Sequence, residues 1–240
     1  MEYVTYLKES LVSNYIFFAP IFGIIPALIW LWFWLKEDIH PEPNKFVVFT
    51  FFMGMLAVMV TLPIQNFTKS FFESNTILLF TIWASIEEIL KFVAGFIGGI
   101  HSVADDEPID PIIYMIISAL GFVALENTLF LIDPLVKGNM TELLITGNMR
   151  FIGATLLHVM SSATVGLFLA ISFYKSKLWK RIYGLLGMII AIILHTGFNL
   201  FIINWISGNF LLVFALVWLG IIIILLMFEK IKNTNFNIEK

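Results

Sequence analysis

Long apolar runs divide this sequence of 240 residues, and they constrain its fold more than any other feature. A helix needs about 20 apolar residues to cross a hydrocarbon core about 30 Å thick. The runs that meet this length are residues 15–35, 46–64, 76–97, 111–132, 151–173, 182–204 and 209–228. The polar breaks between them are short. We therefore expect an all-α, polytopic integral membrane bundle of about seven transmembrane helices, forming a single membrane domain over residues 1–240.

Composition supports the lipid bilayer as the main surroundings of the chain and excludes several functions. Hydrophobic residues make up 60% of the sequence and charged residues only 13%, outside the usual range of soluble domains. The net charge is −3 and no basic tract is present, so we expect no nucleic-acid partner. The absence of cysteine excludes a cysteine nucleophile and thiolate metal ligands.

The basic residues between the runs predict an orientation, because short cytoplasmic loops are enriched in Lys and Arg. With seven spans, one side of the membrane receives Lys8, Lys69, Lys137 and Arg150. The other side receives Lys36, Lys45, Lys175, Lys177, Lys180, Arg181, Lys230, Lys232 and Lys240. We expect a multi-pass protein of the cell membrane, with its N-terminus outside and its C-terminus in the cytoplasm.

Ionisable and amide residues interrupt four of the apolar runs, and such residues inside a membrane suggest a functional site. They are Glu87, Glu88 and Lys91 in the third run, Glu126 and Asn127 in the fourth, His158 in the fifth, and His195 and Asn199 in the sixth. With a rise of ~1.5 Å per residue, the catalytic candidates among these residues lie roughly 8 to 17 Å from the proposed outer face of the membrane. Four helices therefore bring polar groups to a similar depth, which favours one shared site.

Spacing within each run adds detail, since residues three or four apart share one face of a helix. Lys91 can pair with Glu87 at i, i+4 or with Glu88 at i, i+3, and the sequence leaves both pairings open. His195 and Asn199 are also i and i+4. A glutamate that activates water, with histidine and Asn199 donating to the oxyanion, is the chemistry this set favours.

Other interpretations of these residues remain. The glutamates and Lys91 could form a salt bridge that only fixes helix packing, and the hydroxyls of Thr155, Ser161 and Ser162 could supply a nucleophile. Glu87 or Glu88 with His158 and His195 could bind zinc, although no HExxH motif is present. A proton-coupled transporter would also place Glu, Lys and His within the membrane, but the chain shows no internal repeat.

Several motifs, taken in order, resemble the PrsW-type intramembrane proteases, relatives of the type II CAAX prenyl endopeptidases. The resemblance extends from about Pro41 to Phe201. The motifs are HPEPNKFVVFTFFMG at residues 40–54, EEILK at 87–91, DEPIDPIIY at 106–114, GFVALEN at 121–127, RFIGATLLH at 150–158 and HTGFN at 195–199. The sequence differs from the usual family pattern at Pro111 and Met115, where the family tends to have glycine.

The resemblance implies a glutamic-type peptidase that needs neither metal nor another cofactor. In it Glu87 and Glu88 are the principal carboxylates, with His158, His195 and Asn199 assisting. Glu126 is a further catalytic candidate, and Lys91, Phe122 and Asn127 are supporting or substrate-binding candidates. The implied partner is a membrane-anchored protein substrate such as an anti-sigma factor. Non-catalytic scaffolds also occur among the wider relatives and form another alternative.

Overall fold

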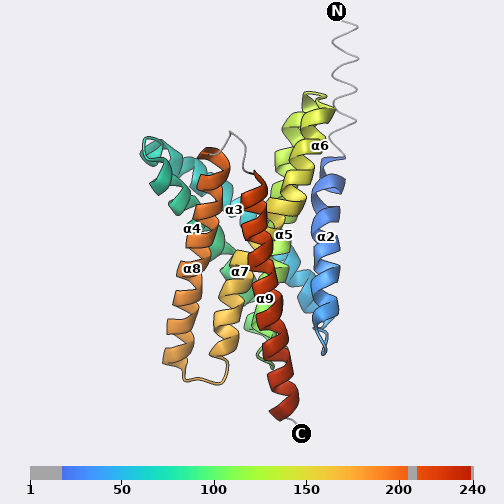
Figure 1. Ribbon diagram of the computed structural model, residues 1–240, viewed down its shortest axis with the longest axis vertical. Coiled ribbons are helices and arrows are strands. Elements are labelled where there is room, and N and C mark those ends of the chain that lie inside the picture. Colours follow the sequence, from blue (N-terminus) through green and yellow to red (C-terminus); the bar gives the residue numbers. More distant parts are fainter. Residues whose placement is uncertain (1–17, 205–209, 239–240) are drawn as a thin grey trace, which may run out of the picture.

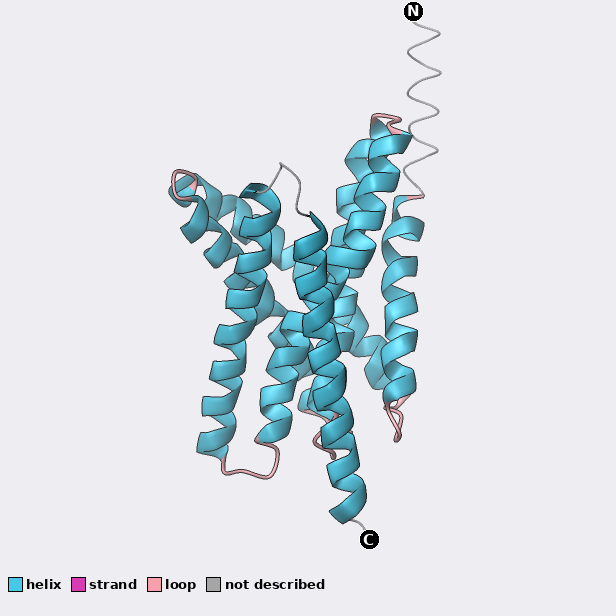
Figure 2. Cartoon of the chain, viewed as in Figure 1, coloured by secondary structure: helices cyan, strands magenta, loops and turns pink. Residues whose placement is uncertain are grey.

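The computed structural model describes residues 18–204 and 210–238, and helices dominate this part of the chain (Figures 1 and 2). No strand occurs within these two ranges. The long helices are α2 (Ala19–Glu37), α3 (Asn44–Phe72), α4 (Thr76–Gly95), α5 (Asp110–Val136), α7 (Thr155–Ile171), α8 (Lys177–Asn204) and α9 (Phe210–Ile238). Each overlaps one of the seven predicted spans, and α3 and α9 extend eight and ten residues beyond theirs, to Phe72 and Ile238. The predicted all-α bundle is thereby confirmed, although residues 15–17 and 209 of those spans lie outside the described residues.

Six helical segments of the described chain are long and apolar enough to cross a membrane. By length and composition they fit a multi-pass membrane protein. Helix α4 is not among the six, because Glu87, Glu88 and Lys91 interrupt its 20 residues. All three side chains are buried inside the bundle, so α4 turns its ionisable face away from lipid.

One of the expected polar breaks contains a further helix. Residues 133–150 were expected to form a polar break, but α5 continues to Val136 and a further helix, α6, covers Met140–Met149. The π-helical turn η2 (Arg150–Ala154) then joins α6 to α7, and a second π-helical turn, η1 (Phe96–Ile100), ends α4. The side chain of Asn139 accepts a hydrogen bond from the backbone N–H of Glu142, which caps α6 and explains where it begins.

Helix α5 forms the centre of the bundle, and α2, α3, α4 and α7 pack around it. All of its residues from Asp110 to Ala124 are buried, as expected for a helix that is apolar on every side. Small residues allow the close approach. A Cβ added to Gly121 would lie 2.0 Å from the carbonyl oxygen of Phe51 on α3.

The helices run in alternating directions along the long axis (Figure 1). The α3–α4 and α5–α6 turns lie at the upper end, while the α7–α8 loop and the end of α9 lie at the lower end. Helices α4, α5, α7 and α8 therefore pass one another in mid-bundle, where their polar residues meet.

Candidate active site

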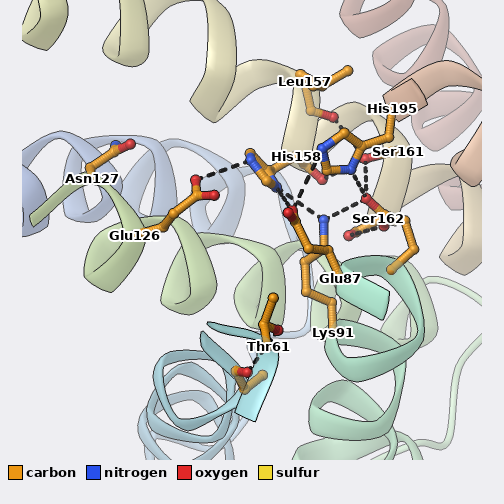
Figure 3. Close-up of polar contacts among 12 residues, drawn as sticks. Thr61, Glu87, Lys91, Glu126, Asn127, Leu157, His158, Ser161, Ser162 and His195 are labelled. Atoms are coloured by element: carbon orange, nitrogen blue, oxygen red, sulfur yellow. Dashed lines mark hydrogen bonds and ion pairs between the residues drawn. The ribbon is translucent and has the colours of Figure 1, made fainter. Parts of the chain in front are cut away.

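Polar side chains of α4, α5, α7 and α8 gather in the interior of the bundle (Figure 3). Glu87, Glu88, His158 and His195 are between 0% and 6% exposed. Glu126 on α5 joins this cluster through His158. Five of the six catalytic candidates thus lie together, as the shared depth of their helices predicted: Glu87, Glu88, Glu126, His158 and His195.

Glu88 is the most fully hydrogen-bonded member of the cluster. Its carboxylate accepts hydrogen bonds from Lys91 Nζ at 2.5 Å and from His195 Nδ1 at 2.7 Å. Ser161 and Ser162 donate to its two oxygens at 2.9 and 3.1 Å. Of the two pairings that the sequence left open, Lys91 adopts the one with Glu88. Four donors leave this carboxylate little freedom, which suits a group that holds its neighbours in place.

Glu87 has a different environment although it is the adjacent residue. Its Oε1 accepts a hydrogen bond from Gln65 Nε2 at 2.8 Å. Its Oε2 is buried without a hydrogen-bond partner, 3.6 Å from His195 Nε2 and 3.9 Å from His158 Nδ1. A buried carboxylate oxygen without a hydrogen-bond partner is costly in a folded protein, so Glu87 differs in this respect from the fully bonded Glu88.

His158 lies between the α4 residues of the cluster and Glu126 on α5. Its Nδ1 lies 3.0 Å from Lys91 Nζ, and its Nε2 lies 3.4 Å from Glu126 Oε2. The Phe122 ring lies against it with a centroid separation of 5.6 Å, and the His195 ring meets it edge-on at 4.9 Å. Lys91 and Phe122 therefore both contact His158, and their supporting roles stay predictions.

The remaining sequence candidates lie further from Glu87. Asn127 accepts a hydrogen bond from Arg150 Nε at 2.5 Å and donates one to Thr155 at 3.2 Å. Asn199 is half-buried one turn beyond His195 on α8. Among the described residues, no hydrogen bond links the Asn199 side chain to the cluster, so its expected role at the oxyanion stays a prediction.

Four residues of the network were not assigned to it from the sequence. Gln65 and Arg150 were placed in polar breaks because an apolar run ended beside each of them. The structure continues α3 through Gln65 and places Arg150 in η2, at the start of the segment that becomes α7. Ser161 and Ser162 were considered only as nucleophiles. Their position one turn after His158 was the signal that they share its face of the helix.

The donors present also fit a metal ion. Glu87, His158 and His195 each offer one ligand atom, and these atoms lie within 4.8 Å of one another. One carboxylate and two imidazoles form a donor set used by zinc hydrolases, and Glu87 Oε2 is free to take part. Glu88 bonds His195 Nδ1, which would orient Nε2 toward such an ion. Lys91 competes for Nδ1 of His158.

Comparisons with known proteins show the family of this chain. Residues 42–227 match the family model described as "PrsW family intramembrane metalloprotease". Protease PrsW of Halalkalibacterium halodurans is 26% identical over 219 residues, covering 89% of this chain and 95% of that protein. The proteins of that name from Geobacillus kaustophilus and Bacillus subtilis are 31% identical over 180 residues and 26% identical over 210 residues. These matches cover 72% and 83% of this chain, and 74% and 90% of the two relatives.

No solved structure matches the chain. The family match covers most of the sequence, including all the residues of the buried cluster. On that evidence the chain belongs to the PrsW family of intramembrane proteases.

Proposed function

We propose that this protein hydrolyses a peptide bond of a membrane-anchored protein by attack of a water molecule activated at Glu87. The unpartnered, buried Oε2 of Glu87, which faces the rings of His158 and His195, carries this proposal. This oxygen can accept a proton because no hydrogen-bond donor occupies it. It also lies beside two imidazole rings. Family membership supports the reaction class, and the geometry supports the assignment of roles.

In the proposed reaction Glu87 accepts a proton from water while the water oxygen bonds to the peptide carbonyl carbon. The carbonyl oxygen becomes an oxyanion. Glu88 holds the ring of His195 through Nδ1, and Nε2, 3.6 Å from Glu87 Oε2, faces the reacting group. The C–N bond then breaks as Glu87 returns its proton to the leaving amine. Asn199 is the further oxyanion donor that we propose, and His158 assists from its place between Lys91 and Glu126.

Glu88 and Lys91 position the site in this scheme. Lys91 is completely buried, so its ammonium group requires a fixed counter-charge, and Glu88 provides it at 2.5 Å. Glu88 also fixes the imidazole of His195 through the bond to Nδ1. The two adjacent glutamates thus divide the work, with Glu87 free to transfer protons and Glu88 bound to its neighbours.

Zinc-dependent hydrolysis is the second candidate, favoured by the compact Glu87, His158 and His195 donor set and by the wording of the family description. A bound zinc ion would polarise the carbonyl and acidify a bound water. In that case the same three residues would hold the ion and Glu88 would orient His195. Both candidates share the substrate class, and an anti-sigma factor anchored in the cell membrane is the example we propose.

The experiment measures cleavage of a single-pass membrane substrate by purified protein and by the Glu87→Gln variant. Gln keeps the size of Glu and can still bond Gln65, but it cannot accept a proton from water. We expect turnover to fall by about 10²- to 10⁴-fold while the melting temperature stays close to that of the wild type. Glu73→Gln is the matched control, because the Glu73 side chain is 72% exposed. Wild-type turnover in Glu87→Gln would overturn the proposal.

Chelation separates the two candidates. A strong chelator leaves turnover unchanged if Glu87 acts without a metal. Loss of turnover on chelation, restored by adding zinc, together with about one zinc ion per chain by elemental analysis, would assign the mechanism to zinc.

A further inference from the structure

Arg150 lies at the edge of the buried cluster. Among the described residues it is the only cation that bonds both Glu126 and Asn127 of α5. It begins η2, the π-helical turn through which the chain enters α7. Its Nη2 donates a short hydrogen bond to Glu126 Oε2, and its Nε donates to Asn127 Oδ1 at 2.5 Å. The guanidinium also covers the Phe130 ring at 3.9 Å. Three contacts from one planar group fix its position more firmly than an exposed ion pair would.

The contact continues from Glu126 into the active site. The oxygen of Glu126 that accepts from Arg150 also lies 3.4 Å from His158 Nε2. Both side chains of the Arg150–Glu126 pair are nearly buried, at 14% and 15% exposure, so solvent screens the pair only weakly. A carboxylate at Nε2 directs the opposite nitrogen of the ring, Nδ1, toward Lys91 and Glu87.

We propose that Arg150 is a positioning residue, which acts through Glu126 to fix the ring of His158 in the orientation that the reaction requires. The inference rests on the proposed hydrolysis and holds whether or not a metal takes part, because either chemistry needs His158 held. It assigns Glu126 a supporting function in place of direct contact with the substrate. It also explains why a charged residue lies in η2, between two apolar segments of a membrane protein.

The test compares Arg150→Met with the double variant Arg150→Met, Glu126→Leu. The single change leaves a nearly buried carboxylate without its cation, so both stability and turnover should fall. The double change removes that carboxylate as well, and the melting temperature should recover. The ring of His158 still lacks its partner in the double variant. We therefore expect kcat to remain lower by on the order of 10- to 100-fold, with KM changed less than twofold.

Arg150→Lys and Lys137→Met complete the experiment. Lysine keeps the charge but lacks the guanidinium geometry, so part of the lost kcat should return. Lys137 pairs with Asp133 at 2.6 Å at the end of α5, the helix that carries Glu126, but both side chains are more than half exposed. Its replacement by Met should change kcat less than twofold.

Recovery of kcat together with stability in the double variant would show that Arg150 only neutralises Glu126, and would overturn the inference. Wild-type kcat in Arg150→Met would also overturn it. Glu87→Gln is assayed alongside to separate the two proposals. If Glu87→Gln cleaves normally, the hydrolytic proposal fails; if it is inactive while the double variant is fully active, only the role of Arg150 fails.

Discussion

At the scale of single residues, Glu87 and Glu88 are chemically identical neighbours with different surroundings. A helix places adjacent side chains about 100° apart, so the two carboxylates point to different partners. Glu88 turns toward Lys91 and the serines of α7, while Glu87 turns toward Gln65 and leaves one oxygen without a partner. The chemistry of each residue is therefore decided by its environment.

Asp38, in the loop after α2, leads to a prediction about pH. The residue is 7% exposed, and its Oδ1 accepts a hydrogen bond from the His40 N–H at 3.1 Å, while Oδ2 has no partner. Burial, with the nearby charge of Glu107 adding to it, raises the pKa of Asp38 to about 6 from a usual value of 3.8. The folded state thus binds more protons than the unfolded state between these two values. The stability that this proton provides is present below about pH 4 and is lost as the pH rises through about 6.

The melting temperature of the wild type should therefore fall between pH 4 and pH 7, and that of Asp38→Asn should fall less. The expected difference is on the order of 1 kcal/mol, or roughly 2 to 4 °C for a chain of this size. Melting curves in detergent at several pH values provide the measurement. Asp133→Asn, at a 64% exposed side chain, is the control. A variant with the same pH dependence as the wild type would refute the assignment to Asp38.

At the scale of elements, the contact between α3 and α5 sets the relative positions of Gln65 and Glu126. The two helices approach through glycines, because Gly121 lies against the Phe51 carbonyl and Gly54 against the Ser118 carbonyl. Backbone atoms cannot move aside as the end of a side chain can. A methyl group at either glycine therefore forces the helices apart.

Gly121→Ala should lower stability by about 1 to 3 kcal/mol and also reduce turnover, because the helices that carry site residues must shift. Gly197→Ala is the matched control, since a Cβ at that position meets nothing within 4 Å. Because alanine favours the helix more than glycine does, this change should leave stability unchanged or raise it by about 0.5 to 1 kcal/mol. The comparison uses melting temperature and substrate cleavage of both variants. Equal stability of Gly121→Ala and the wild type would contradict the close contact.

At the scale of the whole molecule, the alternating helices place the α5–α6 turn and the α7–α8 loop at opposite ends (Figure 1). Most of the basic residues between the helices lie near the second of these ends, which we propose lies in the cytoplasm, with the N-terminus of the chain outside. The exposed α7–α8 loop contains Ser176, while Lys137 marks the opposite end.

The sequence has no cysteine, so the labelling of a single introduced cysteine shows on which side of the membrane that position lies. We expect Lys137→Cys to react with a membrane-impermeant thiol reagent in intact cells. Ser176→Cys should react only after the membrane is permeabilised. The parent chain is the unlabelled control. The opposite labelling pattern would reverse the proposed orientation.

The sequence by itself determined the all-α membrane fold, the seven long helices and the five catalytic candidates that meet inside the bundle. Apolar length and the cost of burying charge act locally along a chain, so both can be recognised without a structure. Sequence reasoning placed α6 and Arg150 in a polar break, because a helix of ten residues is too short to be recognised as a membrane span. Only the tertiary structure decided that Lys91 pairs with Glu88, that Gln65 reaches Glu87 and that Arg150 bonds Glu126. These contacts depend on how separate helices pack, and helical spacing alone allowed Lys91 either glutamate.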